Sequence, residues 1–482
     1  MQKIPFSQIP KISQFFLDYL EENPKVSKYY PNGFKTKEDF AKVISSKAKE
    51  EILREELVEG LLAENNSLGA TKKTLANIKL LGDENTFAVV TGQQMGIFLG
   101  PLYTTYKALT TVKLCEKLKS WFPDKNFVPV FWMESEDHDF AEAAKNYFLT
   151  QQGQLFETSY KNAPNKKIPV GSLEFSQEIS EITDEIFTQT GSTEFSEELK
   201  KVLSESYTGG KTFAEAFGTL FHKLLGDFGV VTINPHDTFW KKNSVAFFET
   251  AISKNEKISQ ALEKIKGEIE AEGFSPQIAT QPENSNLFLL LEKERHKLTR
   301  EGENYSLSGR EENFTKEELL SLTDVTPNLF VTNVVLRPLY QDFLLPTVAY
   351  VGGPSEVAYF AQILKLYPIF EIAEPVIFPR SSVILLEKRI QRLLGKLGIE
   401  LKDSFQNEDE FVKAILENLG ETPEKMISDF SEKITAQFAE LKNKLSEIDP
   451  VLNDISSKTL EKALHQFNVL GQKAGNSYKR KN

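Results

Sequence analysis

The sequence predicts an α/β protein with a Rossmann-like core of parallel strands, inserted connecting lobes and a C-terminal α-helical coiled coil. Three observations support this class. Short apolar segments alternate with helical ones, the apolar segments end in glycine or polar residues, and a seven-residue apolar repeat runs near the C-terminus. The clearest case is Phe87–Thr91, which is followed by Gly92-Gln93-Gln94 and then by a helix that opens after Pro101. In α/β proteins, a strand, glycine loop and helix of this kind hold small anionic ligands.

The bulk composition is that of a globular protein. The chain has 482 residues, of which 40% are hydrophobic and 26% charged. Its net charge of −12 argues against nucleic acid as a partner. Cys115 is the single cysteine, so no intramolecular disulfide forms. Because we find neither a signal-peptide segment nor a membrane-length apolar span, we expect a cytoplasmic protein with no membrane partner.

Helical and strand-like patterns alternate in the first third of the chain. Residues 1–82 have a helical pattern, with capping-box spacing at Thr36 and Asp39. Residues 83–150 form the first part of the core. There a helix joins the first strand to a second strand, Phe127–Met133, as a parallel βαβ unit.

Two inserted lobes interrupt the predicted core. Residues 151–210 are polar and indicate a lobe of hairpin and helix. The core returns at 211–240, with a helix at Phe213–Leu225 and a strand at Gly229–Ile233. Residues 241–326 then comprise a long helix, which runs from about 238 to 272, and a second lobe, which includes a hairpin near Glu301-Gly302.

The last part of the core covers residues 327–382. We expect it to resume with Asn333–Pro338 and to continue with Pro346–Val351. Gly352-Gly353 then opens a helix, and Pro375–Pro379 is the last core strand.

Residues 383–482 are predicted to be helical. An apolar residue recurs every seven positions at Ile427, Ile434, Leu441 and Ile448, and Asp449-Pro450 breaks the helix. This pattern predicts an antiparallel helical hairpin of the coiled-coil type. A seam satisfied within the chain and a dimer interface both account for it.

Polar side chains follow five of the predicted strands. Because the carboxyl ends of parallel strands meet at one edge of a sheet, we expect these side chains to share a site. The groups are Gln93 and Gln94; Glu136, Asp137, His138 and Asp139; Asn234, His236 and Asp237; Tyr350 with Gly352 and Gly353; and Arg380 with Ser381 and Ser382.

The residue types at these positions suggest roles. His138 between Asp137 and Asp139 is suited to general acid–base catalysis, and it could also ligate a metal. We predict no metal site, because neighbouring residues rarely chelate one ion together. The candidate substrate-binding residues are Thr91, Gln93, Gln94, Asn234, His236, Arg337, Gln341, Tyr350, Glu356, Arg380 and Ser381.

Two glycine loops are candidates for binding a nucleotide or phosphate. Their residues are Gly96, Gly100 and the helix start at Leu102 in the first loop, and Gly352 and Gly353 in the second. The first loop is not a P-loop, because Pro101 stands where that motif needs lysine. No GxGxxG motif occurs, which argues against dinucleotide binding of the usual kind.

Several long stretches resemble the bacillithiol-synthesis cysteine-adding enzyme (BshC) family. They follow one another in the same order and span about 300 of the 482 residues. The stretches are Val90–Lys107, Pro129–Phe140, Leu336–Gln341, Leu345–Glu356 and Pro379–Ser382.

This resemblance implies a ligase that joins the carboxyl of cysteine to the amine of glucosaminyl-malate, with bacillithiol as product. It also implies a core related to the HIGH-type nucleotidyltransferases and a homodimer formed through the C-terminal coiled coil. HIGH-type enzymes use ATP through a histidine-containing loop and a lysine-rich loop. Here Gly96–Pro101 has no histidine and Pro379–Ser382 has no lysine. These loops therefore lack the residues with which HIGH-type enzymes use ATP. ATP is still suspected on chemical grounds, because forming an amide from a free carboxylate needs activation.

Two other functions fit the same residues. One is a sugar-nucleotide or acyl-group transferase on the same fold, which would not need cysteine. The other is a non-enzymatic scaffold that assembles pathway proteins through its helical hairpins. The density of polar groups at strand ends favours an enzyme.

Overall fold

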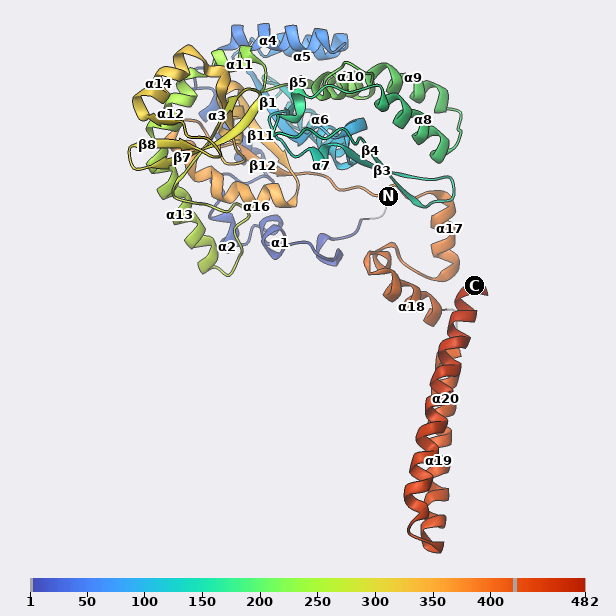
Figure 1. Ribbon diagram of the computed structural model, residues 1–482. Coiled ribbons are helices and arrows are strands. Elements are labelled where there is room, and N and C mark those ends of the chain that lie inside the picture. Colours follow the sequence, from blue (N-terminus) through green and yellow to red (C-terminus); the bar gives the residue numbers. More distant parts are fainter. Residues whose placement is uncertain (1–2, 419–422, 482) are drawn as a thin grey trace. The chain divides into compact units, whose positions relative to one another are not determined.

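The computed structural model describes residues 3–418 and 423–481 (Figure 1). The chain divides into two compact units. One is Ser13–Val383, and the other comprises Met1–Ile12 with Ile384–Asn482. The larger unit contains the predicted core and both inserted lobes.

A five-stranded parallel sheet forms the centre of the larger unit, in the order β12-β11-β1-β2-β5. Its strands are β1 (Thr86–Gln94), β2 (Asn126–Glu134), β5 (Val231–Ile233), β11 (Thr347–Gly352) and β12 (Val376–Pro379). Most of their residues are buried, as expected for strands covered on both faces. Because all five strands run in one direction, their carboxyl ends lie at one edge. The predicted Rossmann-like core is confirmed.

The helices of the first 121 residues agree with the predicted pattern. The Thr36–Asp39 capping box is present at the start of α3. The helix α6 (Tyr103–Trp121) connects β1 to β2, and Leu102 stands at its N-cap position. The N-terminal helices are α1 (Gln14–Leu20), α2 (Pro24–Ser27), α3 (Lys37–Lys47), α4 (Arg54–Ser67) and α5 (Lys72–Leu80).

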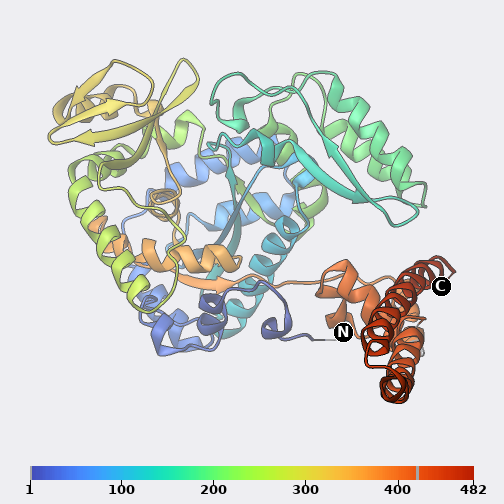
Figure 2. The same cartoon turned by 60° about the horizontal axis from the view of Figure 1, so that its bottom comes forward.

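The first lobe begins before the polar stretch, with a hairpin of β3 (Lys145–Leu149) and β4 (Leu155–Ser159). The short helix α7 (Phe140–Ala143) precedes it, and α8 (Glu178–Thr190) and α9 (Ser196–Ser206) complete it. The second lobe is an antiparallel sheet in the order β10-β6-β7-β8-β9. The lobes lie on opposite sides of the core, in green and yellow in Figure 2.

The second lobe contains the predicted hairpin at Gly302, which joins β7 to β8. Gly302 has a φ of +67°, which favours glycine at this turn. The elements are β6 (Asn284–Leu291), β7 (Glu294–Glu301), β8 (Asn304–Leu307), β9 (Asn313–Thr315), α14 (Lys316–Val325) and β10 (Phe330–Thr332).

The predicted helix Phe213–Leu225 is confirmed as α10. The predicted long helix from 238 to 272 is wrong. Three helices occupy this stretch: α11 (Thr238–Lys242), α12 (Val245–Ser253) and α13 (Asn255–Ala271). At the first break, the Asn243 amide donates to the Phe239 carbonyl and the Ser244 hydroxyl to the Trp240 carbonyl. Such side-chain bonds compete with the hydrogen bonds of a helix and favour its end. The spacing of apolar residues carries no information about them, so it did not locate the break.

The predicted core segment Asn333–Pro338 leads into a helix, and its Val335 and Leu336 are buried. The preceding strand, β10, belongs to the second lobe, and the helix α15 (Arg337–Leu344) begins within the predicted segment. The Asn333 side chain caps this turn by accepting from the backbone N–H groups of Val335 and Leu336. The core resumes at β11, which is followed by α16 (Pro354–Ile363) as predicted.

The C-terminal residues form helices, as predicted. The long helices α19 (Pro423–Ile448) and α20 (Leu452–Lys481) pack together on either side of the Asp449-Pro450 break. The rings of Phe430 and Phe467 meet across this pair, with centroids 5.4 Å apart. The preceding helices are α17 (Lys388–Leu397) and α18 (Glu408–Asn418). Among the described residues, we find no helix whose length and apolarity would let it span a membrane.

Candidate functional site

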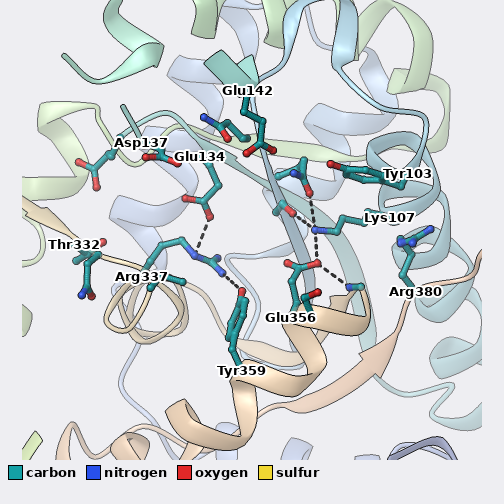
Figure 3. Close-up of a pocket in the computed structure, with 18 of the residues that line it drawn as sticks. Tyr103, Lys107, Glu134, Asp137, Glu142, Thr332, Arg337, Glu356, Tyr359 and Arg380 are labelled. Carbon is teal, nitrogen blue, oxygen red and sulfur yellow. Dashed lines mark hydrogen bonds and ion pairs between the residues drawn. The ribbon is translucent and has the colours of Figure 1, made fainter. Parts of the chain in front are cut away.

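A cavity of about 720 Å³ lies at the carboxyl edge of the parallel sheet (Figure 3). We call it the first cavity. Strands β1 and β2 and helices α6, α15 and α16 contribute to its walls, and β6 and β7 of the second lobe close it from another side. Its charged lining comprises the cations Lys107, Arg295, Arg337 and Arg380 and the acids Glu134, Glu136, Asp137, Glu142 and Glu356.

Lys107 is held by the protein itself. Its Nζ donates to the Gly92 carbonyl at 2.7 Å and to Gln93 Oε1 at 2.9 Å, and it pairs with Glu356 Oε2 at 2.5 Å. These contacts use all three donors of an ammonium group. Burial lowers the pKa of Lys107, and the nearby Glu356 carboxylate acts in the opposite direction. Lys107 therefore fixes the carboxyl end of β1.

Glu356 joins the loop after β11 to this network. One oxygen accepts the Gly353 backbone N–H at 2.7 Å, and the other accepts the Tyr350 hydroxyl at 2.7 Å. Burial favours a raised pKa for Glu356, but Lys107 and these hydrogen bonds outweigh it and lower the pKa. Glu356 thus remains ionised, and it occupies the Gly353 amide that we predicted to hold phosphate.

Arg337 and Glu134 form the second ion pair of the cavity. Arg337 Nε is 2.9 Å from Glu134 Oε1, and its other nitrogens donate to Gln341 and to the Tyr359 hydroxyl (Figure 3). Burial raises the pKa of Glu134 to about 7, although Arg337 opposes this shift. No described residue donates a hydrogen bond to the second carboxylate oxygen of Glu134. Glu134 can therefore accept a proton near neutral pH.

Arg380 lies at the end of the cavity near Tyr103 (Figure 3). Its guanidinium centre is 5.8 Å from the Tyr103 ring centroid, and Nη1 donates to the Ser381 carbonyl at 3.1 Å. No described residue accepts a hydrogen bond from Nε or Nη2. Because a guanidinium has five donors, Arg380 retains the capacity to bind a carboxylate or phosphate.

His138 lies beside Asp137, as its position in the sequence predicts, with Nδ1 3.3 Å from Asp137 Oδ1. His138 does not line the first cavity, and its Nδ1 lies 3.1 Å from Arg295 Nη1. Burial and the Arg295 charge lower the pKa of His138. Asp137 lines the cavity, whereas the Asp139 carboxylate caps α7 by accepting the Glu142 backbone N–H.

A second cavity of about 620 Å³ lies between α4, α10 and α11. It contains Asn234 and His236. Met133 lines this cavity and Glu134 the first one, as expected for adjacent strand residues, which point to opposite faces. The strand-end groups that we predicted to share one site are thus divided between two cavities.

The other predicted residues differ in whether they line the first cavity. Gln93, Gln94, Asp137, Arg337, Gly353, Glu356 and Arg380 line it. Thr91, Gln341 and Tyr350 are buried below and hydrogen-bonded within the protein. His138, Asp139, Gly96, Gly100, Leu102, Gly352 and Ser381 do not line it.

Gly96 and Gly100 have a local structural explanation. A Cβ atom on Gly96 would lie 2.7 Å from the Gly100 Cα, and Gly100 has a φ of +65°. The Asn146 amide donates to the carbonyls of Ile97 and Gly100. These glycines let the loop fold back on itself, which accounts for them without a phosphate.

Several cavity residues are not among those predicted from the sequence. They are Tyr103, Lys107, Glu134, Glu142, Arg295, Thr332 and Tyr359. For Glu134, the signal was a charged residue at the end of an otherwise apolar strand, two positions before the run that we selected. Arg295 and Thr332 come from the second lobe, and their sequence surroundings gave no signal. Within the described parts of the chain, no cluster of three or more His, Cys, Asp or Glu residues could hold a metal.

Comparison with known proteins identifies the family. The model of the BshC N-terminal Rossmann-like domain of bacillithiol biosynthesis matches residues 1–381, and the BshC C-terminal coiled-coil domain matches residues 383–482. The chain is 33% identical to "Putative cysteine ligase BshC" of Koribacter versatilis, over 98% of this chain and 87% of that protein. The identically named protein of Chloroherpeton thalassium is 32% identical, with the same coverage. That of Salinibacter ruber is 31% identical, over 99% of this chain and 87% of that protein. The chain therefore belongs to the BshC family of bacillithiol biosynthesis.

Proposed function

We propose that this chain is a ligase that joins the carboxyl of cysteine to the amine of glucosaminyl-malate within the first cavity. The observation that carries the proposal is the Glu134 carboxyl. It lines the cavity, retains a free oxygen and has a pKa raised by burial to about 7. The names of the relatives support the use of cysteine, and the resemblance of the sequence motifs supports the acceptor.

The chemistry requires a base. The amine of the acceptor is protonated in water, and it must lose a proton to attack a carboxyl carbon. A general base works best when its pKa lies near the working pH. Glu134 meets this requirement, because Arg337 fixes one of its oxygens at 2.9 Å and leaves the other available.

The acceptor carries two carboxylates on its malate part. Arg380 is suited to bind one of them, because Nε and Nη2 have no partner among the described residues. The nearest acid is Glu356, and Lys107 neutralises it. The Gln93 oxygen accepts from Lys107, and the amide nitrogen, which donates to no described residue, is suited to bind a sugar hydroxyl.

Activation of the cysteine carboxyl is assigned to ATP. When bound, ATP supplies the anhydride bond whose loss makes amide formation favourable. Neither glycine loop offers a cradle for its phosphates, because Gly96 packs against Gly100 and the Gly353 amide is taken by Glu356. The free donors of Arg380 are assigned to the acceptor, so no step of this proposal is derived through a bound phosphate.

The enzyme is proposed to act in the cytoplasm as a homodimer formed through α19 and α20. Support comes from apolar side chains that this hairpin leaves exposed. They include Phe430 at 50%, Ile448 at 76% and Ile455 at 54% exposure. Light scattering should give twice the chain mass, and a monomeric mass at micromolar concentration would contradict the dimer.

A reconstituted reaction tests the function. The full chain is incubated with cysteine and glucosaminyl-malate, with ATP, with ADP or without nucleotide, and products are weighed by mass spectrometry. We expect a product of the summed masses less one water, formed with ATP. A chain that forms no such product, but binds a sugar nucleotide without needing cysteine, would support the transferase alternative instead.

A further inference from the structure

The first cavity has a second region with unused polar groups, at the end away from Arg380. It is built around Arg295 of β7, Thr332 of β10 and Asp137 of the loop after β2, and we call it the lobe end. In Figure 3, Asp137 and Thr332 lie on one side of the Arg337–Glu134 pair and Arg380 lies on the other. The second lobe thus contributes directly to the chemistry of the cavity.

Arg295 is buried and incompletely partnered. Its side chain is 6% exposed, and its guanidinium lies on the Phe288 ring at 4.1 Å from the centroid. Nη1 is 3.1 Å from His138 Nδ1 and 3.4 Å from Asp137 Oδ1. Nε is buried without a partner, and no described residue accepts from Nη2. A buried guanidinium with unused donors is costly unless an acceptor binds it.

Two further groups at this end lack partners. Thr332 is 5% exposed, and its hydroxyl makes no hydrogen bond with the described residues. Asp137 uses Oδ1 to accept the His138 backbone N–H at 2.7 Å, and no described residue donates to Oδ2. The lobe end therefore offers unused donors and an unused carboxylate oxygen to the same cavity.

From these groups we infer that the lobe end binds the zwitterionic head of the amino-acid substrate. The α-carboxylate would bind Arg295 and Thr332, and the α-ammonium would bind Asp137. Val334 and Phe288 line the same part of the cavity and would contact a small side chain. This assignment rests on the proposed function, and it divides the cavity between cysteine at the lobe end and glucosaminyl-malate at Arg380.

The charges at the lobe end favour a zwitterion over either single charge. Asp137 would repel a dicarboxylate, and Arg295 would repel a simple amine. Near Arg380 the local acid is neutralised by Lys107, so that end suits the more anionic substrate. Glu134 and Arg295 line the same cavity and interact electrostatically, which puts the base near the bound carboxyl.

Calorimetric binding to the full chain tests the inference with three ligands. They are L-cysteine, cysteamine, which lacks the carboxylate, and 3-mercaptopropionate, which lacks the ammonium. The wild type should bind cysteine about tenfold or more tightly than either analogue, as expected for charge-assisted hydrogen bonds. Arg295→Gln should lose the preference for cysteine over cysteamine. Asp137→Asn should lose the preference over 3-mercaptopropionate.

A control and a second variant keep the test decisive. Arg310→Gln removes an arginine of the same lobe that does not line the cavity, and it should leave all three affinities unchanged. If Arg295→Gln does not fold, Thr332→Val serves instead, because the lost hydroxyl has no partner to leave unpaired. It should weaken cysteine and 3-mercaptopropionate several-fold and leave cysteamine unchanged.

Three results would overturn the inference. The wild type could bind the three ligands equally or not at all, the variants could weaken all three equally, or Arg295→Gln could weaken glucosaminyl-malate in place of cysteine. Because binding needs no turnover, a chain that shows the expected selectivity but makes no product would contradict the proposed function alone.

Discussion

The two cavities at the carboxyl edge of the sheet differ in what their charged groups can still bind. The first has four cations, of which Lys107 and Arg337 are engaged by the protein while Arg295 and Arg380 keep free donors. The second has no lysine or arginine among the described residues that line it. Its acids are Glu59, Glu64, Glu215 and Asp237.

A buried ion pair connects residues of the two cavities. Glu136, which lines the first cavity, pairs with Lys241 at 2.6 Å and lies 3.8 Å from His236 of the second. Burial favours a raised pKa for Glu136, but Lys241 and His236 together outweigh it and lower the pKa. The lesson is that polar residues at strand ends do not by themselves define one site. What distinguishes the first cavity from the second is the pair of arginines, Arg295 and Arg380, that keep donors to which no described residue is bound.

Replacement of the proposed base should give the largest effect. Glu134→Gln keeps an acceptor for Arg337 but cannot take a proton, so kcat should fall by about 10² or more. In the wild type, kcat should rise with pH through about 7, where Glu134 loses its proton. Steady-state rates across this range check both points. If Glu134→Gln kept the wild-type kcat and the same rise of kcat with pH, Glu134 would not be the base.

The next effect concerns the acceptor end of the first cavity. Arg380→Gln should raise the KM for glucosaminyl-malate about tenfold or more, because a charge-assisted bond is lost. The KM for cysteine should stay unchanged, and Arg380→Lys should show a smaller rise, since it keeps the charge. Equal increases for both substrates would show that the cavity is not divided as described.

The second cavity should affect stability through Glu64. Burial raises the pKa of Glu64 to about 8, so the folded protein holds a proton that the unfolded chain releases near 4.5. Stability should therefore fall as the pH rises from about 5 to 8. In Glu64→Gln this loss should be smaller, by on the order of 1 kcal/mol. Urea unfolding at pH 5 and pH 8 measures the free energy of unfolding of both proteins. The same change between the two pH values in wild type and variant would refute the raised pKa of Glu64.

The smallest effect should come from the second cavity's rim. Glu59 is exposed and lines only this cavity. Glu59→Gln should change kcat and both KM values by less than about twofold, in line with surface substitutions in general. A large change in the KM for either substrate would indicate that the second cavity takes part in substrate binding.

The sequence was sufficient for the sheet but not for the site. Apolar segments that end in glycine or polar residues located β1, β2, β11 and β12, because buried parallel strands are apolar along their length. Polar side chains at Gln93, Asp137 and Arg380 were correctly placed at one cavity. Asn234 and His236 lie at the second cavity and not at the first. This placement depends on which face of the sheet each loop covers, and residue spacing does not encode it.

Other site features depend on tertiary contacts. The raised pKa of Glu134 comes from burial, which no local pattern announces. Arg295 reaches the cavity because a strand of the second lobe packs beside the core, some 160 residues after Asp137 in sequence. Gly96 was misleading because a glycine required for close backbone packing looks the same in sequence as one that approaches a phosphate.

A crystal structure of the full chain with glucosaminyl-malate bound would show which cavity holds the acceptor. We expect the ligand to occupy the first cavity, with a malate carboxylate on Arg380 and the amine within hydrogen-bond distance of Glu134. Ligand ordered in the second cavity between α4 and α11, or bound in the first without contact to Arg380 or Glu134, would contradict it.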